Sequence, residues 1–154
     1  MARFLKSVAI CAAVCSLAAV FGATSANAAP KQGLEGAYIG GGFATSNDST
    51  GLVINGRYPF SGVPISIRGG VQINSAGGFS ATVINPSVTY DLPVAKDTNV
   101  YFGAQAAFGQ GNSAFGLKGG AETAIGKSSV IYGDLDVPFN GGGVGLSVGL
   151  AHLF

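Results

Sequence analysis

Hydrophobic and polar side chains alternate along most of the chain beyond its first 33 residues. In residues 143–154 the larger side chains fall at every second position, from Val144 to Phe154, and the positions between them are mostly Gly, Ser and Ala. A period of two is the signature of a β-strand with two different faces. The pattern therefore predicts a strand with one apolar face and one small, partly polar face.

Segments of the same kind recur, with turn-rich sequence between them. The predicted strands are Leu34–Ala44, Gly51–Phe60, Pro64–Asn74, Phe79–Leu92, Asn99–Phe108, Ala114–Ile125, Ser129–Phe139 and Gly143–Phe154. Strands of about ten residues match a tilted membrane-spanning β-strand, and short connections favour antiparallel neighbours. Pro86 interrupts the fourth segment and has no backbone N–H, so we expect a bulge or a local gap there.

Charged residues fall on the polar faces of these strands. They are Arg57, Arg68, Lys118, Glu122, Asp134 and Asp136. A soluble β-barrel or sandwich would point this face outward, whereas a membrane barrel points it into the lumen. Aromatic residues near the ends of the apolar faces favour the membrane arrangement, because transmembrane barrels carry aromatic girdles at both interfaces. We therefore predict an all-β, antiparallel, up-and-down transmembrane β-barrel of about eight strands, with these charges forming a network in its lumen.

The first residues have the features of a secretory signal peptide. Arg3 and Lys6 precede an apolar run, and a small-residue cleavage site ends at Ala28. The run is too short to span a bilayer comfortably, which disfavours a membrane anchor. We predict that residues 1–28 are a cleavable signal peptide helix and that residues 29–154 form the barrel domain.

Composition supports a membrane barrel and excludes some partners. Charged residues make up 10% of the chain, against about 25% in soluble domains. Glycine occupies 26 of the 154 positions, which disfavours helices and suits twisted strands around a crowded interior. The charges beyond the leader nearly balance, so no basic face is available for nucleic acid. Both cysteines, Cys11 and Cys15, lie in the leader, so the exported domain has no disulfide to stabilise it.

The last segment resembles the C-terminal signature strand of bacterial outer-membrane β-barrels. That pattern has a polar residue, a glycine two positions later, and aromatic or apolar residues at the third-last and last positions; Ser147, Gly149, His152 and Phe154 occupy these places. As a whole the chain resembles the small, porin-like, eight-stranded barrels of the OmpA/OmpX type. The resemblance implies a bacterial outer-membrane location and contact with outer-membrane lipid. It also implies periplasmic chaperones and the barrel-assembly machinery as partners, with these four residues as the assembly signal.

Three further patterns could carry chemistry, and each has a simpler interpretation. Residues 121–128 fit a loose phosphate-binding loop, but a strand follows where that loop needs a helix. Asp134 and Asp136 could hold a divalent metal, yet nothing supplies the further oxygen ligands. His152 lacks the serine two positions later that outer-membrane deacylases carry, because Phe154 stands there. We therefore expect no catalytic, cofactor or metal site.

Three functions stay open from the sequence. The first is a structural or interaction role for a barrel whose lumen is filled by polar and charged side chains, since eight strands enclose a space just wide enough for side chains. The second is a narrow porin-like pore for small solutes or ions, which small lumen positions would favour. Those positions are Gly70, Gly103, Ala107, Gly120, Gly145, Gly149 and Ala151. The third and weakest is a lipid-modifying enzyme, for which no nucleophile–base pair is evident.

Overall fold

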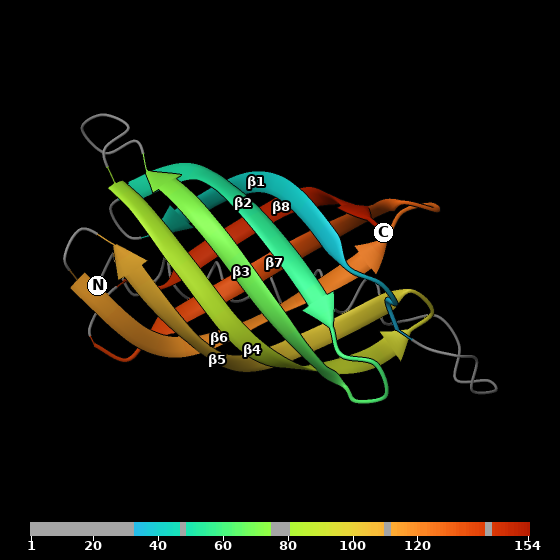
Figure 1. Cartoon of the computed structure of the whole chain (residues 1–154). Coiled ribbons are helices and arrows are strands. Elements are labelled where there is room, and N and C mark those ends of the chain that lie inside the picture. Colours follow the sequence, from blue (N-terminus) through green and yellow to red (C-terminus); the bar gives the residue numbers. More distant parts are fainter. Residues whose placement is uncertain (1–32, 47–48, 75–80, 110–111, 141–142) are drawn as a thin grey trace, which may run out of the picture. The chain divides into compact units, whose positions relative to one another are not determined.

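Eight antiparallel strands close into one barrel (Figure 1). The computed structural model describes residues 33–46, 49–74, 81–109, 112–140 and 143–154. The strands are β1 (Tyr38–Ser46), β2 (Ser49–Pro59), β3 (Ile65–Asn74), β4 (Ala81–Ala95), β5 (Thr98–Gly109), β6 (Asn112–Ala124), β7 (Ser129–Pro138) and β8 (Gly145–Leu153). The predicted all-β, up-and-down barrel is confirmed, whereas the predicted signal peptide and its cleavage site lie outside the described residues.

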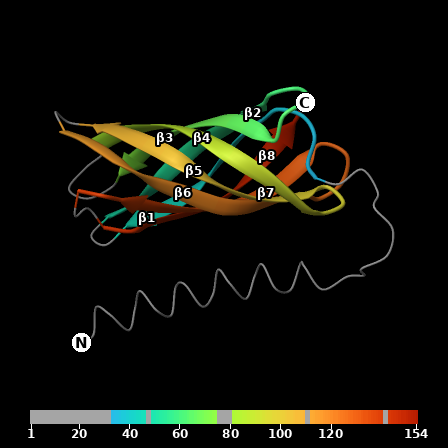
Figure 2. The ribbon, with the colours of Figure 1, turned by 90° about the horizontal axis from the view of Figure 1, so that it is seen from below.

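Each strand pairs with the next, and β1 closes the barrel by pairing with β8. That last ladder runs from Tyr38 opposite Leu153 to Thr45 opposite Leu146. The two ribbon views show the strands crossing the barrel wall obliquely (Figures 1 and 2). Because the sheet closes on itself, no strand edge is left unpaired, which is a requirement for any β-sheet surrounded by lipid. Within the described ranges, no helix has the length and apolarity needed to cross a membrane.

The two ends of the barrel differ in their connections. The terminal end carries the start of β1, the end of β8 and the turns at residues 60–64, 96–97 and 125–128. The loop end carries the end of β1, the start of β8 and the described residues that flank the other four connections, such as Asn74 and Ala81. The turns of the terminal end use left-handed backbone where sharp reversal requires it, at Gly62 (φ 81°), Asp97 (φ 57°) and Gly126 (φ 102°). Glycine and aspartate tolerate this conformation better than most residues.

The predicted strand boundaries hold to within three residues except at the start of the first strand. That strand was predicted from Leu34, but β1 begins at Tyr38. The prediction was wrong because the apolar pattern of the sequence extends back to Leu34, whereas the extended backbone begins only at Tyr38. Gly33 (φ 102°) and Gly36 (φ 94°) adopt left-handed conformations that interrupt an extended chain. The residues before Tyr38 turn into the terminal end of the barrel instead.

The irregularity expected in the fourth strand is present in β4. Its pairing with β5 skips Asn85 and Pro86, and the register is the same on either side of the gap. Pro86 has no N–H to donate across the ladder, which explains why pairing lapses there. A register shift occurs separately, between Pro93 and Ala95 near the terminal end.

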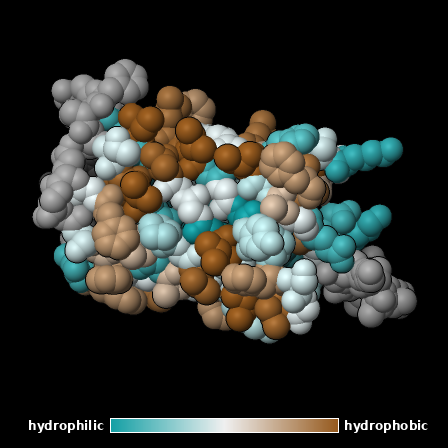
Figure 3. All heavy atoms as spheres, viewed as in Figure 1, coloured by the Kyte–Doolittle hydropathy of each residue, from teal (hydrophilic) through white to brown (hydrophobic). Residues whose placement is uncertain are grey.

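Side chains alternate between the lumen and the outer surface of the barrel. In β6, Leu117 is 52% exposed on the outside, whereas its neighbour Lys118 is 5% exposed inside. The apolar faces therefore point outward and the polar faces inward. Figure 3 shows hydrophobic residues spread over the visible wall, and hydrophilic residues projecting at the end that carries the C-terminus.

Candidate functional site in the barrel lumen

Two arginines and two carboxylates meet in the half of the lumen near the terminal end. Arg68 lies between Asp91 and Glu122, with nitrogen–oxygen distances of 2.9 and 2.6 Å. Arg57 pairs with the same two carboxylates, at 2.7 and 3.3 Å. All four residues, which we call the terminal cluster, are at most 6% exposed. Positive and negative charges balance in this cluster, which buried charges require if they are to remain ionised.

Neutral side chains complete the hydrogen bonding of the terminal cluster. The Tyr38 hydroxyl donates to Glu122 at 2.9 Å and accepts from an arginine at the same distance. Asn99 donates to the other oxygen of Glu122 at 3.0 Å. Thr89 and Ser66 each accept from an arginine Nε, at 2.9 and 3.1 Å, and the Ser66 hydroxyl also donates to the aspartate. The four strands β2, β3, β4 and β6 supply the charges, so the network ties together opposite walls of the barrel.

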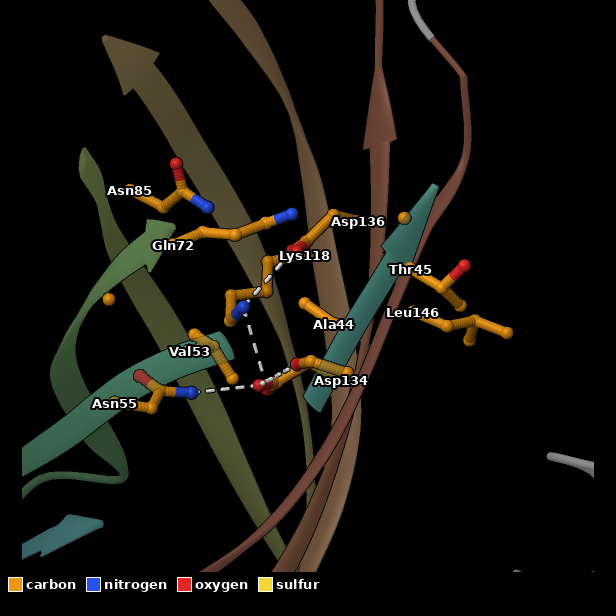
Figure 4. Close-up of a pocket in the computed structure, with 13 residues that line it drawn as sticks. Ala44, Thr45, Val53, Asn55, Gln72, Asn85, Lys118, Asp134, Asp136 and Leu146 are labelled. Carbon is orange, nitrogen blue, oxygen red and sulfur yellow. Dashed lines mark hydrogen bonds and ion pairs between the residues drawn. The ribbon is translucent and has the colours of Figure 1, made fainter. Parts of the chain in front are cut away.

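A second cluster of charges lies toward the loop end. The Lys118 ammonium lies 3.0 Å from Asp136 and 3.5 Å from Asp134, and Figure 4 shows it reaching between the two aspartates. Asn55 and Ser147 donate to Asp134 at 2.8 and 2.9 Å. This loop-side cluster of Lys118, Asp134 and Asp136 has one more carboxylate than cations. Its surplus negative charge depends on neutral donors.

Tyr101 connects the two clusters. Its hydroxyl donates to Asp134 of the loop-side cluster. The guanidinium carbon of Arg68 lies 3.5 Å from the centroid of its ring, a cation–π contact with the terminal cluster. Tyr101 is 1% exposed, so a buried side chain joins the two charged clusters into one continuous network.

All six charged residues predicted for the lumen lie there, and the structure adds a seventh, Asp91. Asp91 pairs with both arginines, but it was not among the charges that the sequence predicted for the lumen. A signal was present: Asn85, Ser87, Thr89 and Asp91 alternate with apolar residues. It was missed because Pro86 lies within the pattern.

The cavity beside the loop-side cluster is small. A cavity of about 20 Å³ lies beside the loop-side cluster, lined in part by Asn55, Gln72, Asn85 and Gly145 (Figure 4). A volume of this size holds about one water molecule.

The inward-facing glycines do not all leave room for water. A Cβ on Gly103 would run into the carbonyl oxygen of Val88 on the neighbouring strand. Gly120 and Gly149 lie under the hydroxyls of Tyr101 and Tyr132, which occupy the space that a side chain would fill. Three of the small positions that favoured a pore are therefore taken up by backbone or tyrosine. Such tyrosine–glycine packing also supports strongly curved strands.

Of the four residues of the predicted assembly signal, two lie on the lumen side of β8 and two point outward at or just beyond its end. The Ser147 side chain points into the lumen and donates to Asp134, and Gly149 lies against Tyr132. His152 and Phe154 point outward with their rings edge to face, 5.0 Å apart at the centroids. The Phe154 N–H donates to the Ala37 carbonyl at 2.8 Å, which fixes the end of the strand. Recognition of these residues during assembly stays a prediction.

The phosphate-loop-like segment and the Asp134/Asp136 pair have the simpler structures that the sequence favoured, a turn and an ion-pair cluster. Residues 126–128 form a turn between β6 and β7, closed by a 2.8 Å hydrogen bond from the Ile125 N–H to the Ser129 carbonyl. Asp134 and Asp136 share Lys118. In the part of the chain that the structure describes, no three His, Cys, Asp or Glu side chains gather as metal ligands would.

Comparison with known proteins gives matches in structure alone. No protein-family model matches the sequence, and no curated protein does. A structure titled "De novo design of transmembrane beta-barrels" matches with a TM-score of 0.66 at 13% identity, covering 79% of this chain and 97% of that one. The fold is that of the small transmembrane β-barrels.

Two natural proteins with this fold also match. The outer membrane protein Ail of Yersinia pestis has a TM-score of 0.56 at 13% identity, covering 78% of this chain and 100% of that one. Neisserial surface protein A has a TM-score of 0.51 at 15% identity, covering 78% and 98%. These matches support the predicted barrel architecture. They do not single out the OmpA/OmpX type.

Proposed function

We propose that the protein is an integral outer-membrane β-barrel with a closed lumen and a structural or interaction role. The observation that carries this proposal is the reversed distribution of its side chains. Large apolar residues such as Phe43 (66% exposed) and Leu150 (59% exposed) cover the outside, while Arg68 is 1% exposed inside. A soluble protein rarely exposes so continuous an apolar surface, whereas lipid stabilises one.

The positions of exposed aromatic side chains support the same conclusion. Tyr58, Phe60 and Phe154 lie at the terminal end, and Phe108, Phe115 and Phe139 lie at the loop end; all six are at least 42% exposed. Transmembrane barrels carry aromatic girdles of this kind at their two interfaces with water. The partners that follow are outer-membrane lipid and, during biogenesis, periplasmic chaperones and the barrel-assembly machinery. Export with cleavage near Ala28 belongs to the same proposal.

The packed lumen favours a closed barrel over the second candidate, a narrow pore. The two charged clusters and Tyr101 span the interior, and the cavity beside them has room for about one water molecule. The pore retains some support from Gly70 and Gly145, which line that cavity. Conductance measured in planar bilayers separates the two: a filled lumen gives no channels, and stable unitary channels would favour the pore. Lipid hydrolysis assays test the weaker enzyme alternative.

The inside-out arrangement is tested by placing a charge on the outer wall. Leu117→Arg is expected to destabilise the barrel by about 2–4 kcal/mol, the cost of an arginine at the bilayer midplane. Leu117→Ala is the matched control, because it shortens the same side chain without adding charge. The measurement is refolding into lipid vesicles followed by urea titration, with the heat-dependent shift in gel mobility as a check on folding. Equal stability of Leu117→Arg and Leu117→Ala would contradict the proposed lipid contact.

The predicted assembly signal has its own test in cells. Phe154→Ala removes the exposed aromatic ring but keeps the backbone bond to Ala37, and is expected to lower the amount of heat-shifting barrel in the outer-membrane fraction. Phe139→Ala, which removes an exposed ring at the loop end, is the control and should assemble at near-normal levels. Equal levels of the two variants in the outer-membrane fraction would contradict a special role of the last residue in assembly.

A further inference from the structure

Residues Gly33–Gly36, here called the strap, precede the first strand and enter the terminal end of the barrel. The Leu34 side chain is 4% exposed. It packs against Tyr38, Val130, Tyr132 and Ala151, the apolar group that lines this end of the lumen. The strap thus covers part of this end of the lumen, beside the terminal cluster.

The backbone of the strap is held by lumen side chains and by one backbone hydrogen bond, from the Gly33 N–H to the Ala95 carbonyl at 3.1 Å. The Leu34 N–H donates to Asn99 Oδ1 at 3.1 Å, and Asn99 Nδ2 donates back to the Leu34 carbonyl at 3.3 Å. Arg57 donates to the carbonyls of Leu34 and Gly36, at 3.0 and 3.3 Å. Asn99 therefore binds both the N–H and the C=O of Leu34, the same backbone groups that a neighbouring strand would use.

These contacts can break without disturbing the barrel. The β1 ladders to β2 and β8 begin at Tyr38, beyond the strap. If the strap leaves, Arg57 still has its ion pairs with Asp91 and Glu122, and Asn99 still donates to Glu122. Opening therefore leaves no buried charge without an opposite partner, which is the costly outcome in a protein interior.

The strap also has hinges and space beside it. Gly33 and Gly36, on either side of the buried leucine, have φ angles of 102° and 94°, a conformation that glycine enters and leaves at little cost. A groove of about 630 Å³ lies between the strap and residues 58–65, and Arg57, Asp91 and Asn99 also form part of its lining. The strap is thus packed against the lumen on one side and faces open space on the other.

We propose that the strap is a displaceable plug, which swings about its two glycines into this groove and admits water past Arg57 and Asp91 to Arg68 and Glu122 while all eight strands stay paired. The proposal goes beyond the proposed function, because it concerns the movement of one segment and not the location of the protein. Local opening of this kind is expected where a segment makes few contacts that the rest of the fold depends on.

Thiol labelling tests the plug. Leu34→Cys and Ser87→Cys are made in the full chain with Cys11 and Cys15 replaced by serine, refolded into lipid vesicles and exposed to a membrane-impermeant maleimide. Ser87 is a suitable control because it is also buried, at 5% exposure, but lies on a paired strand. We expect Leu34→Cys to label at least about tenfold faster than Ser87→Cys while the heat-shifting band persists. Adding Asn99→Ala to Leu34→Cys should speed labelling further. Equal labelling of the two sites, at the rate of barrel unfolding, would overturn the proposal.

The unsubstituted protein gives a second measurement that does not depend on a variant folding. Hydrogen exchange of the Leu34 amide should be faster than that of the Tyr101 amide, which belongs to the β5–β6 ladder. Equal protection of the two amides would show that the strap opens only when the barrel does. Vesicle binding and the heat shift, recorded on the same samples, show separately whether the membrane barrel itself has formed.

Discussion

The two halves of the lumen stabilise their buried charges in different ways. In the terminal half, two arginines face two carboxylates, and large side chains fill the remaining space, including Tyr38 and Tyr132, whose stacked rings lie 6.0 Å apart. In the loop half, one lysine faces two aspartates beside a small cavity. The buried amide oxygen of Asn85, which lines this cavity, has no hydrogen-bond partner among the described residues.

The difference shows what permits charge inside a barrel this narrow. Where the charges balance and neutral donors complete the network, the interior can be dry and tightly packed. Where a carboxylate is in excess, the structure retains polar side chains and room for about one water molecule, which can supply the missing hydrogen bonds. We therefore expect the paired strands of the terminal half, as distinct from the strap, to be rigid and to determine stability, and the loop half to tolerate change.

The largest expected difference in stability comes from removing one cation from each half of the lumen. Arg68→Met leaves Asp91 and Glu122 with one arginine between them in a site where all of these residues are at most 6% exposed, and should cost about 3–5 kcal/mol. Lys118→Met removes the cation of the loop-side cluster, where the Asp136 side chain is 20% exposed, and should cost about 1–2 kcal/mol. Urea titration of each variant in lipid vesicles measures the difference.

A neutralising second substitution sharpens this test. Glu122→Gln should restore part of the stability that Arg68→Met loses, because it brings the terminal cluster back to one cation and one anion. The same substitution should not rescue Lys118→Met, whose lost partners are Asp134 and Asp136. A Lys118→Met variant less stable than Arg68→Met would reverse the assignment of the rigid half.

A smaller effect is expected from adding a methyl group to each half. In Gly149→Ala the new Cβ meets the Tyr132 hydroxyl and, at 2.5 Å, the carbonyl oxygen of Gly41. Neither can move far, so we expect a loss of about 2 kcal/mol from overpacking. In Gly145→Ala the nearest atom is the Asp136 Cβ at 3.4 Å, and stability should change by less than about 0.5 kcal/mol. The midpoint of urea unfolding reports both, and equal losses would mean that the loop half is as tightly packed.

Most of the barrel could be predicted from the sequence because one physical rule determines most of it. A wall between lipid and a polar lumen imposes strict alternation, so the face of Arg57 or Lys118 follows from its position alone. The strap could not be predicted in this way, because Leu34 continues the apolar pattern while the flanking glycines end the strand. The ion pairs within the lumen could not be predicted either, because the acid that contacts Arg68 depends on the stagger of strands that are distant in sequence.

The filling of the lumen by tyrosine was missed for a related reason. Small residues such as Gly120 and Gly149 indicate empty space when they are read along one strand. Across the ladder, however, each faces a tyrosine: Gly120 is opposite Tyr101, and Gly149 is opposite Tyr132. Only the register between neighbouring strands shows that a large side chain on one fills the space left by a glycine on the other.

The smallest expected change in stability comes from removing the hydroxyl of Tyr101 or of Tyr132. Tyr101 donates to Asp134 and so links the two charged clusters, whereas the buried Tyr132 hydroxyl has no hydrogen-bond partner in the described part of the chain. Tyr101→Phe should therefore cost about 1.5 kcal/mol, the contribution of a hydrogen bond to a charged group. Tyr132→Phe removes an unpaired polar group and keeps the ring, so it should leave stability unchanged or raise it slightly. Urea titration in vesicles measures both, with Tyr58→Phe on the exposed outer wall as the control for loss of a hydroxyl. If Tyr132→Phe destabilises the barrel as much as Tyr101→Phe, an ordered water must satisfy the Tyr132 hydroxyl, and the terminal half is wetter than its packing indicates.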